Sequence, residues 1–91
     1  MECKALGQLV TSKAGRDKGR YFFVVGIVDE DYVLIADGDL RKISSPKKKK
    51  IKHLVFHDMA DNDIFQKVKE NRQITDAELR KCLESMGLLQ K

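Results

Sequence analysis

The residues with the clearest chemistry in this sequence are lysines and arginines, and they gather in two short segments. Residues 13–20 combine two glycines with four cations, and residues 47–50 are four consecutive lysines. Ammonium and guanidinium groups pair with phosphate oxygens, and glycines with positive φ let the backbone approach a phosphate closely. The candidate phosphate-binding residues are Lys13, Arg16, Lys18, Gly19, Arg20, Lys47, Lys48, Lys49, Lys50 and Lys52.

The distribution of charge supports an anionic partner. The 91 residues include 18 Lys and Arg and 14 Asp and Glu, which gives a formal net charge of +4. Residues 1–57 hold 12 of these cations against 7 acidic residues, whereas residues 58–91 hold 6 against 7. We therefore expect a basic surface on the first two-thirds of the chain. Folded RNA suits such a surface because proteins read it mainly through its shape, phosphates and 2′-hydroxyls.

Two alternative sites involve histidine. His53 and His57 are spaced for one face of a strand, and they could bind zinc with two cysteines, Cys3 and Cys82, that have no second ligand near them in sequence. Another cluster has the ligand types of a metal-dependent hydrolase: His57, Asp58, Asp61 and Asp63. Its aspartates fit turns and helix caps better. We therefore expect no metal and no cofactor. Since no nucleophile has an apparent base and no cleft is implied, we also expect no enzyme and no small-molecule substrate.

Aromatic residues near the cations could stack on bases, but most of them are expected in the core. Tyr21, Phe22 and Phe23 belong to one continuous apolar run, and the alternation of a strand should turn at least two of the three inward. Tyr32 opens another apolar run beside an acidic turn. It is a weaker candidate for stacking than for packing.

Several classes of protein are disfavoured. The longest apolar stretch, residues 21–28, is far shorter than the about 20 residues of a membrane helix. The N-terminus shows no secretory pattern, and the two cysteines form no CxxC pair. We therefore expect reduced thiols and a cytoplasmic protein with no membrane partner. The composition, 42% hydrophobic and 35% charged, is that of a folded domain rather than a disordered tail.

The elements that must position the cations are expected to be short strands. Apolar and β-branched residues predict strands at 8–12, 21–28, 32–36, 40–43 and 51–56. Gly26 indicates a β-bulge, and Asp37-Gly38 indicates a tight turn. Five such strands predict a small β-barrel over residues 1–57, because closing a barrel removes exposed sheet edges.

The remaining residues, 58–91, change to a helical period. One helix is expected from Asp61 or Asn62 to about residue 71. A second is expected over 75–87, with a Thr75-x-x-Glu78 capping box, Ile74 packed on the first turn and Gly87 at the end. Its apolar stripe is Leu79, Cys82, Leu83 and Met86. We expect this helical extension to pack on the barrel through Leu79, Leu83 and Met86.

The order of the segments resembles a known motif. From Gly7 to Gly38, a short apolar strand, a basic glycine loop, a long apolar strand, an acidic turn and another apolar strand follow one another. This order resembles the KOW motif, the SH3-like barrel of several ribosomal proteins and of NusG-type transcription factors. Residues 15–25 with Asp37-Gly38 are most similar to the fourteen-e, six-e and twenty-seven-e types of large-subunit ribosomal proteins, and to short bacterial ribosomal-like KOW-domain proteins. Gly19 stands at the motif's glycine, and the resemblance covers residues 6–56.

The resemblance implies both a fold and a function. The implied fold is mainly β, a small SH3-like (KOW) barrel followed by C-terminal helices. The implied function is non-catalytic binding of RNA, above all ribosomal RNA, through basic barrel loops. The alternative is a protein-interaction module that binds ribosomal or RNA polymerase proteins through the barrel or the helix stripe. The basic charge of residues 1–57 favours RNA, whereas an exposed stripe would favour a protein partner.

Overall fold

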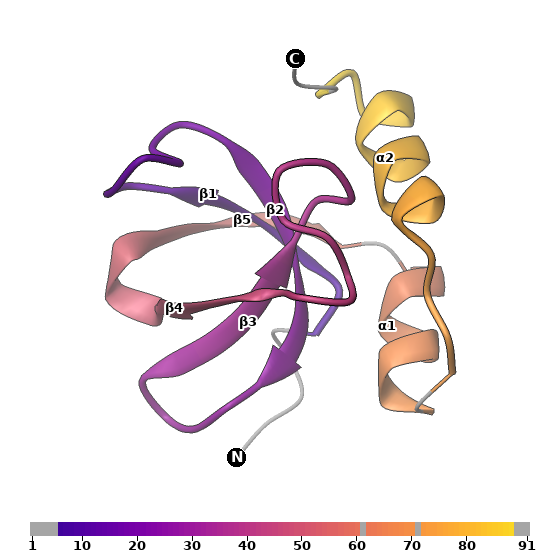
Figure 1. Ribbon diagram of the computed structural model, residues 1–91, viewed down its shortest axis with the longest axis horizontal. Helices are drawn as coiled ribbons and strands as arrows, with labels where there is room; N and C mark the ends of the chain where they lie inside the picture. The colour runs from indigo at the N-terminus through magenta and orange to yellow at the C-terminus, as the bar shows by residue number, and fades with distance from the viewer. Residues whose placement is uncertain (1–5, 61, 71, 89–91) are drawn as a thin grey trace.

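The computed structural model describes residues 6–60, 62–70 and 72–88 (Figure 1). Five strands come first, with a short 3₁₀ helix before the last of them, and two helices follow. The elements are β1 (Gln8–Ser12), β2 (Tyr21–Ile27), β3 (Tyr32–Ala36), β4 (Lys47–Lys50), η2 (Ile51–His53), β5 (Leu54–Ala60), α1 (Asn62–Lys69) and α2 (Asp76–Ser85). The mainly β fold with two C-terminal helices is confirmed.

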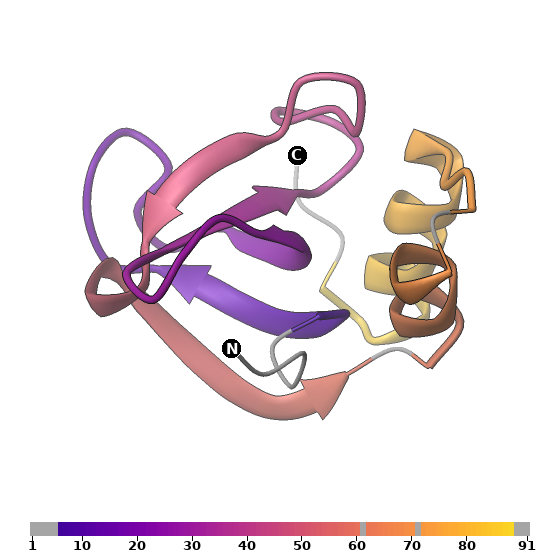
Figure 2. The same cartoon turned by 90° about the horizontal axis from the view of Figure 1, so that it is seen from below.

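The strands form one antiparallel sheet in the order β4-β3-β2-β1-β5. The sheet is strongly curled, and α1 and α2 lie together on one side of it (Figure 2). The register between β2 and β3 shifts between Val24 and Gly26, where the sequence predicts a bulge. A bulge increases local twist, so this shift contributes to the curl.

The fourth strand differs from the prediction. Residues 40–43 do not form a strand, and the lysine run itself pairs with β3 as the edge strand β4. The reason for the first difference is Asp37, whose Oδ1 accepts hydrogen bonds from the backbone N–H groups of Asp39 and Arg41 and so holds this segment in a turn. Lysines on an edge strand also discourage pairing with another chain. The last strand begins at Leu54 rather than residue 51, because η2 occupies residues 51–53.

Each face of the sheet buries its own hydrophobic cluster. Phe22 and Phe23 point to opposite faces and are both fully buried, which confirms the core role expected for at least two of the three aromatic residues. The cluster inside the curl contains Leu6, Val10, Phe22, Val24, Val33, Ile35 and Leu54. The cluster beneath the helices contains Leu9, Phe23, Ala36, Ile64, Ile74, Leu79 and Leu83. The continuous apolar run of β2 therefore serves two cores.

Local signals set the ends of α2 as predicted. The Thr75 side chain accepts a hydrogen bond from the Glu78 backbone N–H, and Ile74 packs in the same cluster as Leu79. At the other end, Gly87 has φ 75°, its N–H bonds to Glu84 O at 2.9 Å, and Leu88 N–H bonds to Leu83 O at 2.8 Å. These two bonds make a Schellman motif, which satisfies carbonyl groups at the end of the helix.

The stripe of α2 packs in one hydrophobic cluster with residues of the sheet. Leu79 is 0% exposed and Leu83 is 2% exposed, and Met86 packs partly buried on the same cluster. The division of the chain into a domain at 1–57 and an extension at 58–91 stays a prediction. Both α1 and α2 contribute residues to the core on this face of β1, β2 and β3.

The burial of the stripe predicts a large loss of stability on truncation. Leu83→Ala should lower the free energy of unfolding by about 2–4 kcal/mol, because it removes buried methyl groups and leaves a cavity. Lys81→Ala, on the exposed side of the same helix, should change it by less than about 0.5 kcal/mol. Urea denaturation of both variants measures the difference. Equal stabilities would show that α2 does not depend on its contact with the sheet.

Candidate nucleic-acid interface

The basic loop between β1 and β2, residues 13–20, is a compact hairpin loop. Gly15 and Gly19 have φ of 85° and 86°, in the left-handed region that the sequence predicts for them. The Gly19 N–H bonds to Ser12 O at 2.9 Å, and Arg20 N–H bonds to Asp17 O at 3.0 Å. With the backbone held in this way, the exposed side chains of the loop are Lys13, Arg16 and Lys18.

A buried ion pair joins this loop to β4. The Lys49 ammonium donates to Asp17 Oδ1 at 3.0 Å and to the Ala14 carbonyl oxygen at 2.9 Å. The Ser12 hydroxyl lies 2.8 Å from the same carboxylate oxygen. Asp17 is 3% exposed and Lys49 is 8% exposed, so the ion pair is buried and is not part of the exposed surface. Loop and lysine strand are thereby held side by side, as a combined basic surface requires.

The strand geometry divides the lysine run between two faces. Lys49 is the register partner of Val33 and Lys47 that of Ile35, and both of these β3 residues belong to the core inside the curl. Lys48 and Lys50 point the other way, where both ammonium groups lie over the Tyr32 ring. Four consecutive lysines therefore do not form one patch.

Lys49 is the predicted contact residue that the structure places least accessibly. Its ammonium group donates hydrogen bonds to Asp17 and to the Ala14 carbonyl oxygen inside the protein. Lys49 therefore holds the loop in place but is hardly accessible to a ligand. The exposed members of the predicted set are Lys13, Arg16, Lys18, Gly19, Lys48 and Lys52. The half-buried members are Arg20, Lys47 and Lys50.

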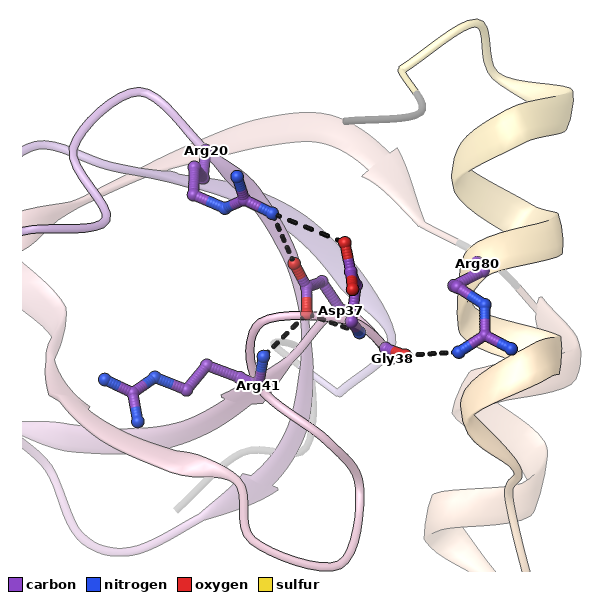
Figure 3. A network of polar contacts seen from close by, with 6 residues as sticks. Arg20, Asp37, Gly38, Arg41 and Arg80 are labelled. Carbon is purple, nitrogen blue, oxygen red and sulfur yellow. Dashed lines mark hydrogen bonds and ion pairs between the residues drawn. The ribbon is translucent and has the colours of Figure 1, made fainter. Parts of the chain in front are cut away.

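Arg20 has a structural role that sequence reasoning missed. Its guanidinium lies 3.4 Å from the buried Asp37 carboxylate (Figure 3) and 4.0 Å from that of Asp39. Arg80 of α2 donates to the carbonyl oxygen of Gly38 in the same turn. Arg20 therefore ties the start of β2 to the turn after β3, and that turn is in contact with α2. The sequence contained one signal for these ion pairs of Arg20, because Asp37 and Asp39 flank the glycine of the predicted turn.

Of the two histidines, His57 takes part in packing and hydrogen bonding, whereas His53 is exposed. His57 Nε2 bonds to the Thr11 hydroxyl, and its ring lies 5.7 Å from that of Tyr21. Among the described residues, no group of three or more His, Cys, Asp and Glu side chains is placed to hold a metal ion. Cys3 and Asp61 of the two alternative metal sites lie outside the described residues.

Within the part of the chain that the structure describes, no helix has the length and apolarity to cross a membrane.

The chain has relatives among known proteins. No family model matches it. It is 34% identical over 71 residues to YbzG, a proposed ribosome-binding protein of Bacillus subtilis (strain 168), covering 78% of this chain and 96% of that protein. It is 32% and 31% identical over 85 residues to the large ribosomal subunit protein eL14 of Pyrobaculum arsenaticum and of Pyrobaculum aerophilum, covering 93% of this chain and 76% of each relative.

These matches show first a class of proteins to which the chain is similar and then the family to which it belongs. The relatives are a proposed ribosome-binding protein and proteins of the large ribosomal subunit, so the class that they define is that of ribosome-related proteins. The chain belongs to the family that contains YbzG and eL14. The similarity to the fourteen-e type, expected from residues 15–25, is confirmed. One expectation was too narrow: a match over 85 of 91 residues leaves out only 6, so it extends well into residues 58–91.

Proposed function

We propose that this chain is a non-catalytic RNA-binding protein that contacts ribosomal RNA. In this proposal the curled sheet is an SH3-like barrel of the KOW type, and the contacts come from the basic loop and the neighbouring cations of β4 and η2. A ribosomal partner also implies a cytoplasmic setting. The names of the relatives support ribosome association, since each refers to the ribosome.

The observation that carries the proposal is the buried Lys49–Asp17 pair. It supports a fixed loop whose exposed cations, Lys13, Arg16 and Lys18, lie beside β4. Cations held in advance lose less conformational freedom when they bind phosphates than cations on a mobile loop. Because Lys and Arg contacts to phosphates carry little sequence information, recognition should depend on the shape of the RNA rather than on its sequence.

The protein-interaction alternative has less support. In that alternative, an exposed stripe on α2 would dock a protein partner, but Leu79 and Leu83 are already covered by the sheet. A protein partner would have to use the sheet itself or the outer face of the helices. Ribosomal proteins in contact with the same RNA remain compatible with the RNA proposal.

The salt dependence of binding tests the proposal. Arg16→Gln with Lys18→Gln should flatten the slope of log affinity against log salt by about 1–2 units, because each phosphate contact contributes roughly 0.7–0.9. The matched control is Lys69→Gln with Lys81→Gln, which removes two exposed charges from α1 and α2 and should leave the slope unchanged. Fluorescence anisotropy with a structured ribosomal RNA fragment at several salt concentrations gives both slopes.

Two results would contradict the proposal. If the two double variants changed the slope equally, the effect would come from net charge and not from the loop. If the unmodified protein bound the RNA without any salt dependence, phosphate contacts would not be the source of affinity. The protein-interaction alternative would then be favoured.

A further inference from the structure

A second candidate contact lies on the opposite face of β4 from the buried ion pair. Tyr32 is the first residue of β3, and its register partner is Lys50 at the end of β4. The Lys48 ammonium lies 4.7 Å from the centre of the Tyr32 ring, and the Lys50 ammonium lies 5.7 Å from it. One aromatic ring and two cations therefore meet at one end of the edge strand.

The backbone beneath this ring is held in place. Asp29 Oδ1 accepts hydrogen bonds from the N–H groups of Asp31 at 2.8 Å and Tyr32 at 2.9 Å. The Tyr32 carbonyl oxygen accepts from Val28 N–H at 3.0 Å. A side chain on such a fixed turn can present its ring with little loss of conformational freedom on binding.

The two lysines here differ from Lys49 in their partners. Within residues 6–60, 62–70 and 72–88, neither Lys48 nor Lys50 has a carboxylate within ion-pair distance, and Lys48 is exposed. Their contact with the ring is a cation–π interaction at a partly exposed site, which is weaker than the stacking of a nucleobase on an aromatic ring. A base can therefore displace an ammonium from the ring, and the flexible lysine stem lets that ammonium move to a phosphate.

We infer that Tyr32, flanked by Lys48 and Lys50, is a stacking platform for an unpaired base of RNA. The inference rests on the proposed function and deepens it, because it names single-stranded nucleotides as part of the ligand. The exposed carboxylates of Glu30 and Asp31 repel phosphate from the turn side. The base therefore stacks on the ring with its phosphate directed toward Lys48, farther along β4.

Two RNA probes separate the platform from the basic loop. One is a blunt duplex, and the other is a hairpin with the same stem and a loop of unpaired bases that includes 2-aminopurine. With the unmodified protein, we expect quenching of the 2-aminopurine fluorescence on binding. Tyr32→Leu should weaken binding of the hairpin by about 5- to 100-fold and leave binding of the duplex unchanged, whereas Tyr32→Phe should bind both like the unmodified protein.

The outcomes distinguish the two proposals. If the unmodified protein binds both probes with salt dependence but does not quench 2-aminopurine, or if Tyr32→Leu weakens both equally, the platform is wrong and the proposed function stands. If the unmodified protein binds neither probe, both are wrong. Thermal melting of Tyr32→Leu checks that this variant folds. If the variant does not fold, the 2-aminopurine fluorescence with the unmodified protein decides whether Tyr32 is a stacking platform.

Discussion

Gly38→Ala should destabilise the protein by about 3–5 kcal/mol, the sum of left-handed backbone strain and a steric overlap that the site cannot relax. Gly38 has φ 81°, and a Cβ at this position would overlap the backbone oxygen of Asp76 and crowd Arg80. Asp76 cannot move away freely, because its side chain accepts a hydrogen bond from the Ile43 N–H at 2.7 Å. The turn after β3 and the first turn of α2 would have to separate.

Gly19→Ala is the matched control for this prediction. Gly19 also has positive φ, 86°, but a Cβ there would meet no atom within 4 Å. Only the backbone strain remains, so we expect a loss of about 1–2 kcal/mol. Urea denaturation of both variants gives the comparison. Similar losses in the two would mean that the contact of Gly38 with α2 contributes nothing to stability.

Lys49→Met should lower the free energy of unfolding by about 3–5 kcal/mol, because it leaves the Asp17 carboxylate buried without its charged partner. It should also weaken RNA binding, since the loop loses its attachment at Asp17 and Ala14. Lys48→Met removes the same charge from the exposed face of the same strand. That control should leave stability within about 0.5 kcal/mol of the unmodified protein.

A second change separates the lost charge pair from lost packing. Asp17→Asn in addition to Lys49→Met removes the unpaired charge and should recover part of the stability, since an apolar or neutral replacement of both partners is tolerated better than the loss of one. If the double variant were no more stable than Lys49→Met alone, the loss would be due to packing of the lysine stem and not to the ion pair.

The same pair predicts how stability depends on pH. Burial by itself would raise the pKa of Asp17, but hydrogen bonds from Ser12 and Lys49 and the positive charges of Lys49 and Lys47 hold it below its ordinary value. Because the pKa is lower in the folded state, the pair contributes fully above the unfolded pKa and loses its contribution as pH falls through the folded pKa. The unmodified protein should therefore lose more stability on acidification than the double variant, and equal losses would exclude Asp17 as the cause.

Much of the fold is decided by local sequence. The strands at 8–12 and 32–36 follow from short runs of apolar and β-branched residues between polar turns, and their observed bounds are those expected. The ends of α2 follow from Thr75, Glu78 and Gly87, each of which acts on backbone groups within a few residues of itself. Such signals are readable because both partners are close in sequence.

The prediction of a strand at 40–43 was wrong, although the side chain that overrides it, Asp37, is also close in sequence. Its alternation of apolar and basic residues is weak, and the hydrogen bonds of the Asp37 side chain hold the segment in a turn. In contrast, β4 forms from lysines, whose strand propensity is low, because β3 supplies a pairing partner and Asp17 supplies a counter-charge. Tertiary context outweighed propensity in β4, whereas a local side chain outweighed it at 40–43.

For the candidate interface, the sequence by itself determined which residues are cations and that Gly15 and Gly19 would take positive φ. It could not determine which cations are available, because that depends on partners distant in sequence. Lys49 meets Asp17 across 32 residues, and Arg20 meets Asp37 across 17. The pleat of β4 then sends neighbouring lysines to opposite faces, and only the register with β3 decides which face is the core. Composition therefore identifies a basic protein, whereas the register of one edge strand decides which lysines hold the loop and which are exposed to solvent.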